Sequence, residues 1–221
     1  MTHVVLASTS PSRREILART GITPQVAPSG VEEDAVQARH PGASVAEISG
    51  VLAAAKGAAV VARILTGDLV PDTTEDVLVL LASDSVLEVD GRAVGKPHTA
   101  EATRAVWRAM GGRVADLWTG HHVVRMDRVD GAWTLAGETV EVVGTRIHTV
   151  APSPAELEAY IATEEPFEVA GALTIDGYGG ALVERIEGDH LNVIGLSLPT
   201  LRKVVTDLGV EWFSLWDMNR G

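Results

Sequence analysis

The stretch VVLASTSPSRREILARTG, residues 4–21, predicts a short strand, a polar turn and a helix in direct succession. Residues 4–6 form an apolar, β-branched run, which is typical of a strand. Ser10 is a favourable N-cap, and Pro11 suits the first helical position, where a missing N–H costs nothing. Gly21 is a suitable residue just beyond the helix end. The unit therefore places a helix N-terminus close to the end of a strand.

The turn of this unit gathers groups that bind anions. A helix N-terminus presents unpaired N–H groups and a partial positive charge, and the hydroxyls of Ser8 and Ser10 lie at the same end. Arg13 adds a guanidinium in the first turn, where a cation is unfavourable unless an anion or a carboxylate lies nearby. The pattern indicates a phosphate site, and a surface helix with solvated arginines explains it equally well.

The length and composition of the chain limit its domain organisation, its cysteine chemistry and its classes of partner. The chain has 221 residues, 46% of them hydrophobic, and no cysteine. We therefore expect one domain over residues 1–221, with a largely aliphatic core and no disulfide or thiolate metal site. The net charge of −12 disfavours a DNA or RNA polymer as partner, but it does not exclude a small phosphate compound. Neither a signal peptide nor a membrane-spanning apolar run is evident, so we expect a cytoplasmic protein without a membrane partner.

Lysine is scarce in this chain, which has only Lys56, Lys96 and Lys203 among its 18 basic residues. Lys56 falls in a predicted helix, residues 44–64, that begins with a capping box. It borders the apolar stripe of that helix, where a lysine either snorkels from the core edge or points its amine into a cleft. Two explanations fit the few lysines that remain. Either function needs a compact ammonium group at those positions, or the lysines were retained by chance.

The apolar run at residues 77–82 predicts a strand that is covered on both faces. We expect Ser83-Asp84-Ser85 to end this strand and residues 86–89 to form another. Asp90-Gly91 is a strong two-residue hairpin turn, which predicts that residues 92–96 return antiparallel to the second strand. The hairpin therefore brings the end of its return strand back toward the polar triplet.

Asp84 and Lys96 are candidate catalytic residues on this hairpin. A regular register places Ser85 opposite Lys96, which brings Lys96 back to the Asp84-Ser85 corner but on the face of Ser85 rather than of Asp84, unless a bulge at Gly95 changes the parity. Lys96 would lower the pKa of Asp84, while partial burial raises it. Asp84 would then serve as a general base or hold a metal that activates water. An ordinary turn residue that caps its own backbone is the alternative interpretation.

The remaining elements complete an α/β protein with a mixed sheet. We expect helices at 99–110, 154–162 and 199–208, long strands at 114–126 and 133–150, and a short strand at 182–186. Residues 24–42 and 188–195 have the composition of loops. The glycine-rich stretch at residues 170–180 lacks the strand-then-helix context of a dinucleotide site, and no P-loop pattern occurs.

Two further groups of side chains could bind a metal ion. Glu32, Glu33 and Asp34 form a run of carboxylates, which is either a solvated surface or a source of an oxygen ligand for Mg²⁺. His121 and His122 face opposite ways on a strand and cannot easily share an ion. The other histidines have no suitable spacing, so we interpret all seven as structural.

Ser8, Ser10 and Arg13 resemble the Ser-x-Ser-x-x-Arg opening of the Maf family, nucleoside triphosphate pyrophosphatases once described as septum-formation inhibitors. The later motifs of that family have counterparts here in order and with similar spacing. They are Glu32-Glu33, Ala53 with Lys56, Ser83-Asp84-Ser85-Val86, Gly95-Lys96-Pro97, Thr119-Gly120, Glu165-Pro166 before Ala170-Gly171, and Asn192-Val193-Ile194-Gly195-Leu196. Each piece is weak by itself, but the series covers nearly the whole chain and is specific.

The resemblance implies a fold, a reaction and a set of roles. The fold would be a mixed twisted sheet flanked by helices, with two lobes around a central cleft, as in Maf and inosine-triphosphatase-like proteins. The reaction would be hydrolysis of a nucleoside triphosphate to a monophosphate and pyrophosphate with Mg²⁺ or Mn²⁺. Asp84 would activate water, and Glu33 with Asp84 would bind the metal. Arg13, Lys56 and Lys96 would hold phosphate charge, and Ser8 and Ser10 would cradle phosphate.

The chain departs from the pyrimidine-specific branch of that family at three positions linked to the choice of base. Ser12 stands where that branch has arginine, Ser85 where it has threonine, and Asp176 where it has glutamine. A preference for dTTP and UTP therefore does not transfer to this chain. Val169 also replaces a common lysine, a change that would lower activity if that lysine were needed.

Two classes of function remain open at this point. The first is an enzyme that clears non-standard or excess nucleotides, and the second is a nucleotide-binding regulator of septum formation and cell division with little turnover. The presence of Asp84, Lys56 and Lys96 favours the enzyme, because a pure binder needs no water-activating carboxylate. Antiparallel edges and an aromatic-rich tail permit a homodimer.

Overall fold

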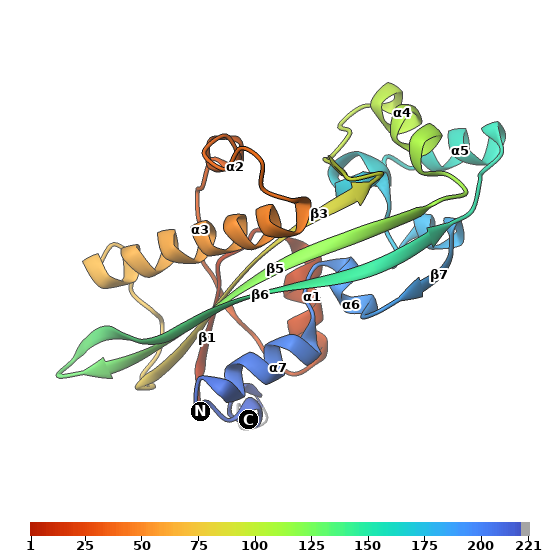
Figure 1. Ribbon diagram of the computed structural model, residues 1–221. Coiled ribbons are helices and arrows are strands. Elements are labelled where there is room, and N and C mark those ends of the chain that lie inside the picture. The colour runs from red at the N-terminus through yellow and green to blue at the C-terminus, as the bar shows by residue number, and fades with distance from the viewer. Residues whose placement is uncertain (218–221) are drawn as a thin grey trace.

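The computed structural model describes residues 1–217, and its centre is a mixed sheet with the strand order β2-β1-β3-β5-β6-β7 (Figure 1). A seventh strand, β4, pairs with β3 beside this path. The strands are β1 (His3–Leu6), β2 (Gln25–Val26), β3 (Val77–Val89), β4 (Arg92–Val94), β5 (Val114–Val129), β6 (Ala132–Thr149) and β7 (Val183–Glu187). β1 runs parallel to β2 and β3, and the other neighbours are antiparallel. The predicted α/β fold with a mixed sheet is confirmed.

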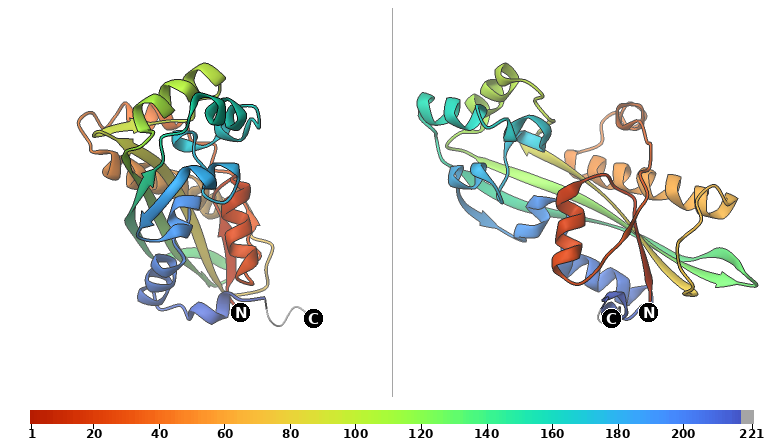
Figure 2. Two further views of the ribbon diagram at one scale, coloured as in Figure 1. Left: turned by 90° about the vertical axis from the view of Figure 1, so that its right-hand side faces the viewer. Right: turned by 180° about the vertical axis from the view of Figure 1, so that it is seen from behind.

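Helices cover both faces of the sheet. They are α1 (Pro11–Arg19), α2 (Glu33–Gln37), α3 (Val45–Thr66), α4 (Ala100–Met110), α5 (Pro154–Ile161), α6 (His190–Ile194) and α7 (Leu198–Asp207). Short 3-10 turns occupy Glu165–Glu168, Ala170–Ala172, Tyr178–Leu182 and Trp212–Leu215. In Figure 1, α3 lies along one face and α7 lies on the other, while α4 and α5 gather at the far end of the long strands. Figure 2 shows the same arrangement from the side and from behind, with α1 beside α7.

The side chains of β3 point alternately to the two faces of the sheet, so neighbouring residues pack into different hydrophobic cores. Val79 and Leu81 belong to the core under α1 and α7, whereas Leu78, Leu80 and Ala82 belong to the core under α3. Successive side chains of a strand point to opposite faces. Near its end, β3 enters a third core with α4 and α5 through Leu87 and Val89. Residues 83–85 therefore lie between the cores at the two ends of the strand.

The prediction that Ser83-Asp84-Ser85 ends a strand is wrong. β3 runs without interruption from Val77 to Val89, and the three polar residues pair with His121, Gly120 and Thr119 of β5. The long antiparallel partner supplies backbone hydrogen bonds through the triplet, which outweighs the weak strand preference of serine and aspartate. The strand thus carries a buried carboxylate in its interior rather than at a turn.

Most of the predicted helix ends are confirmed. Ser10 caps α1, and the capping boxes that begin α3 and α5 are both formed. Residues 24–42 and 188–195, which we expected to be loops, contain β2 with α2, and α6, respectively. These two helices have five residues each, which is too short for a clear helical period in the sequence.

The helix α3 is long and apolar enough to cross a membrane by length and composition, contrary to our expectation that no segment would be. Half of its most apolar window is buried inside the protein. Its contacts with β3, β5 and β6 are those of a core helix packed on a sheet.

Candidate functional site

A gap in the sheet edge exposes one side of β3 at the polar triplet. Along that edge, β1 pairs with β3 as far as Leu81, and β4 begins to pair at Leu87. Residues 82–86 lie between the two ladders. Side chains from both faces of the sheet can therefore approach the same short segment of β3, which is where the candidate site lies.

Lys56 joins two carboxylates on the α3 side of this gap. Its Nζ donates to Asp84 Oδ1 and lies 2.7 Å from Glu33 Oε1. The side chains of Lys56 and Asp84 are 11% and 10% exposed, whereas that of Glu33 is 51% exposed. α3 supplies the lysine, β3 the buried carboxylate, and α2 the outer one. Of the two interpretations of Lys56, the amine pointing into a polar site is the correct one.

Burial raises the pKa of Asp84 above its usual value of 3.8. The positive charges of Lys56 and Arg13 act against this rise without cancelling it, and the nearby negative charge of Glu33 adds to it. The sequence predicted both opposing effects but assigned the lowering charge to Lys96. Lys56 has that role instead, because it is the lysine that contacts the carboxylate.

Arg13 is held on the other side of the gap by neutral oxygens. Its Nε donates to the Gly195 carbonyl at 2.9 Å, its Nη1 to Ser8 Oγ at 3.3 Å, and its Nη2 to Ser85 Oγ at 3.1 Å. Burial lowers its pKa, while the charges of Asp84 and Glu33 raise it. Arginine stays charged in proteins, and within residues 1–217 it forms no ion pair. Its charge is therefore oriented but not neutralised by direct contact.

The serines of the first turn mainly organise the loop. Ser8 Oγ accepts the Ser10 N–H at 3.2 Å, and Ser10 Oγ accepts the Arg13 N–H at 3.4 Å as the N-cap of α1. Ser12 is partly exposed in the first turn of α1. The structure thus brings Ser8, Ser10 and Arg13 together as predicted, with the serine oxygens already engaged by the protein.

Lys96 does not join this cluster, so the predicted Ser85–Lys96 pairing is wrong. The predicted register holds at the two pairs nearer the turn, Val89 with Arg92 and Leu87 with Val94, and β4 then ends. The next residue, Gly95, accepts a hydrogen bond from Gly171 N at 3.2 Å instead of continuing the ladder. Lys96 is exposed and forms no hydrogen bond or ion pair with any described residue.

Asp176 also lies apart from the cluster, in an exposed part of the glycine-rich segment. Glu165 organises that segment, because its carboxylate accepts hydrogen bonds from Thr174 Oγ1 and from the backbone N–H groups of Tyr178 and Gly179, both at 2.9 Å. Burial raises the pKa of Glu165, but these bonds outweigh it, and the pKa lies below its usual value. The segment packs against β3 beyond the gap, where Gly171 approaches Leu87.

Three buried polar residues near Arg13 were given no role from the sequence. Thr119 Oγ1 bonds Ser85 Oγ at 2.9 Å and the Asn192 carbonyl at 3.1 Å. His121 Nε2 accepts the Ser197 N–H at 2.9 Å. Thr119 belongs to the Thr119-Gly120 motif and Asn192 to the motif of residues 192–196, and these motifs were the available sequence signal. The structural interpretation of His121 agrees with its complete burial.

Glu33 and Asp84 suit a divalent cation that phosphate also coordinates. Both carboxylates bond the same nitrogen, Lys56 Nζ, so their oxygens converge on one point. No group of three or more acidic, histidine or cysteine side chains that could hold a metal occurs within residues 1–217. Mg²⁺ is commonly bound by one or two carboxylates together with substrate phosphates. The donor set therefore fits a metal brought in with a phosphate compound.

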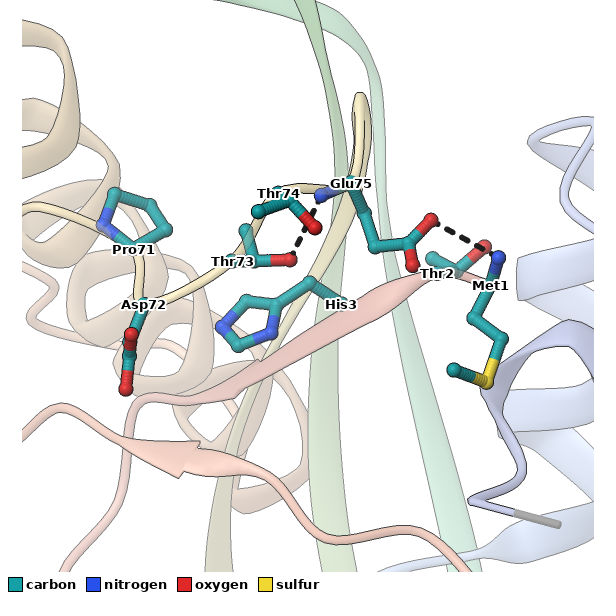
Figure 3. Close-up of a pocket in the computed structure, with 8 residues that line it drawn as sticks. All are labelled: Met1, Thr2, His3, Pro71, Asp72, Thr73, Thr74 and Glu75. Carbon is teal, nitrogen blue, oxygen red and sulfur yellow. Dashed lines mark hydrogen bonds and ion pairs between the residues drawn. The ribbon is translucent and has the colours of Figure 1, made fainter. Parts of the chain in front are cut away.

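A hollow of about 500 Å³ lies elsewhere, at the start of β1 and just before β3 (Figure 3). It is lined by Met1, Thr2, His3, Pro71, Asp72, Thr73, Thr74 and Glu75. The N-terminal amine bonds Glu75 Oε2 at 2.9 Å across it. None of the candidate site residues lines this hollow.

The fold and the cluster define an α/β protein with a buried carboxylate, a lysine and an arginine at a gap in a mixed sheet, an arrangement suited to phosphate chemistry. The family model described as "Maf-like protein" matches residues 3–208. The chain belongs to the Maf family.

Relatives cover almost the whole chain. A protein named nucleoside triphosphate pyrophosphatase from Nocardia farcinica is 46% identical over 96% of this chain and 96% of its own length. A protein of the same name from Corynebacterium aurimucosum is 45% identical over 97% of this chain and 98% of its own. A third, from Mycobacterium ulcerans, is 41% identical over 99% of both chains.

Proposed function

We propose that the chain hydrolyses a nucleoside triphosphate between the α- and β-phosphates, releasing a monophosphate and pyrophosphate. The observation that carries this proposal is Asp84, a buried carboxylate of raised pKa that lies within the electrostatic reach of Lys56 and Arg13. The names of the relatives support the same reaction.

Asp84 acts as the general base in the proposed mechanism. It takes a proton from a water molecule whose oxygen forms a new bond to the α-phosphorus, while the bond from that phosphorus to the bridging oxygen breaks and pyrophosphate leaves. A carboxylate with a raised pKa accepts a proton more readily than an ordinary one. Burial is the main cause of the raised pKa of Asp84.

Cations stabilise the charge that moves to the leaving group. Arg13 presents a guanidinium held by neutral oxygens, so an arriving phosphate need not displace a carboxylate from it. Lys56 begins on Asp84 and Glu33 and can shift toward phosphate. Lys96 is exposed and without a partner among the described residues, and we include it as a third phosphate contact. Such preorganised charge is usually the largest contribution to catalysis.

A divalent cation, Mg²⁺ or Mn²⁺, belongs to the proposal. Glu33 and Asp84 would hold it together with phosphate oxygens. When bound, it supplies charge stabilisation to the phosphoryl group and the leaving pyrophosphate. Base choice would depend on Ser12, Ser85 and Asp176. We also propose a cytoplasmic location and no nucleic-acid polymer or membrane partner, and we keep the homodimer as a prediction.

The test is pyrophosphate release with Mg²⁺ or Mn²⁺ over a panel of common and modified nucleoside triphosphates. The proposal expects equal amounts of pyrophosphate and monophosphate with at least one substrate, and the preferred base would then test Ser12, Ser85 and Asp176 by exchange. Release of inorganic phosphate alone would contradict the bond assignment. Nucleotide binding without any release would instead favour the regulatory role in septum formation, with Val169 as the first position to change.

A further inference from the structure

A chain of two hydroxyl groups, Ser85 partly buried and Thr119 completely buried, extends from Arg13 to α6. Arg13 Nη2 bonds Ser85 Oγ at 3.1 Å, Ser85 Oγ bonds Thr119 Oγ1 at 2.9 Å, and Thr119 Oγ1 bonds the Asn192 carbonyl at 3.1 Å. Thr119 and Asn192 are completely buried. The chain crosses from β3 to β5 and then to α6, so it joins three elements behind the guanidinium.

The two ends of this chain fix the direction of every hydrogen bond in it. A guanidinium can only donate, a carbonyl can only accept, and each hydroxyl has one proton to give. Thr119 must give its proton to Asn192, and it therefore accepts the proton of Ser85. The hydroxyl of Ser85 therefore donates its proton to Thr119 Oγ1, and its oxygen accepts the hydrogen bond from Arg13 Nη2. Hydrogen bonds aligned in this way strengthen one another.

The α6 turn holds Arg13 at a second atom. The Gly195 carbonyl accepts from Arg13 Nε at 2.9 Å. Asn192 anchors α6, which leads directly into Gly195, since its Nδ2 donates to Val143 O and Thr145 Oγ1 on β6, both at 3.1 Å. The Gly195 carbonyl thus holds the guanidinium at Nε, and the hydroxyl groups of Ser85 and Thr119 hold it at Nη2. Together these contacts fix the plane of the guanidinium group.

We propose that Thr119 is a positioning residue that orients the Arg13 guanidinium through Ser85, so that its positive charge faces the phosphate groups of the substrate. This inference rests on the proposed function for its kinetic consequence, while the orientation itself concerns the free protein. Thr119 makes no contact with substrate in this proposal and acts on Arg13 through Ser85.

The kinetic test compares Thr119→Val with Thr119→Ser and with a matched control. Thr119→Val retains the shape and removes the hydroxyl, and we expect kcat/KM for pyrophosphate release to fall roughly tenfold, the scale of one net hydrogen bond. Thr119→Ser retains the hydroxyl and should stay within about twofold of the parent. Thr103 is the control, because it is equally buried and its hydroxyl bonds the Thr99 carbonyl on α4, in the core at the other end of the sheet. Thr103→Val should lose stability without this loss of kcat/KM.

A double-mutant cycle separates positioning from general destabilisation. In an Arg13→Lys background, Thr119→Val should cost less than about twofold further in kcat/KM, because the group it orients is gone. The same tenfold loss in both backgrounds would overturn the inference, as would an equal loss in Thr103→Val.

A measurement on the free protein distinguishes failure of this inference from failure of the proposed function. The Arg13 Nε–H signal in a ¹⁵N NMR spectrum, assigned by its loss in Arg13→Lys, should exchange slowly with solvent. We expect Thr119→Val to speed its exchange and shift it, and Thr103→Val to leave it unchanged. If Thr119→Val fails to fold, Ser85→Ala breaks the same chain one step nearer to Arg13 and should give the same change. An unaltered signal would overturn the inference, whatever the enzyme assay shows.

Discussion

Lys56 on α3 donates to Asp84 on β3, so one ammonium group links the buried carboxylate of the central strand to the helix that covers it. The two residues are 28 positions apart in the sequence. The same ammonium reaches Glu33 on α2 at 2.7 Å. Three elements are therefore brought together by charge at the gap in the sheet edge.

Asp84→Asn should lower pyrophosphate release by about 100-fold or more, because an amide cannot accept the proton of water. Nucleotide binding, measured by calorimetry, should change little, since Arg13 and Lys56 remain. Stability at neutral pH should hold as well. The folded protein retains the Asp84 proton more tightly than the unfolded chain does, so Asp84 stabilises most at acid pH, and this contribution is lost as the pH rises through its raised pKa. Undiminished turnover would remove Asp84 from the mechanism.

Lys56→Met should move the acid limb of the pH–kcat profile to higher pH. The positive charge of Lys56 lowers the pKa of Asp84 against the effect of burial, so its removal lets that pKa rise further. A general base works only when ionised, and the rate then falls at a higher pH on acidification. Lys203→Met is the control, because Lys203 pairs with Asp207 on the exposed face of α7 at 2.9 Å. A limb at the same pH in both variants would contradict the assignment of Asp84 as base.

His121 should make the protein less stable as the pH falls. Burial lowers its pKa from 6.5 to about 4, so the folded state resists the proton that the unfolded chain accepts. Its stabilising contribution is complete above pH 6.5 and is lost as the pH falls toward 4. Between pH 7.5 and pH 5 the loss should be about 2 kcal/mol. Urea unfolding at the two pH values measures it.

The matched variants for this prediction are His121→Gln and His190→Gln. Glutamine at position 121 does not titrate, so the loss of stability between the two pH values should shrink by about 2 kcal/mol relative to the parent. His190 is exposed, and its replacement should leave that loss unchanged. An equal pH response in the parent and in His121→Gln would contradict the prediction.

The candidate site residues could be named from the sequence because they stand in local motifs. Ser10 could be assigned as an N-cap, and the hairpin register at Leu87 and Val89 followed from the turn. The position of Lys96 could not be predicted from the sequence. It depends on a hydrogen bond from Gly171 N–H to the Gly95 carbonyl, and these two residues are 76 positions apart in the sequence.

The strand through Asp84 was missed for a related reason. A single sequence does not show that β5 pairs with every residue of the polar triplet, and serine and aspartate by themselves indicate a turn. Once the strand is continuous, its alternation of faces explains why Asp84 points to Lys56 and Ser85 to Arg13. Short-range patterns thus indicated the candidate groups, while long-range pairing determined which of them meet.

Gly120→Ala should destabilise the protein and weaken the site from a distance. A Cβ at Gly120 would lie 2.2 Å from the Ser49 carbonyl oxygen of α3, and backbone cannot rotate away as a side chain can. The helix must move off β5, and we expect a loss of about 3 kcal/mol in the free energy of unfolding. Since α3 also carries Lys56, kcat/KM should fall along with the melting temperature. Gly95→Ala is the control for stability, because its Cβ would meet nothing within 4 Å and its backbone conformation suits alanine. A melting temperature of Gly120→Ala equal to that of the parent would show that α3 does not pack against β5 as closely as described.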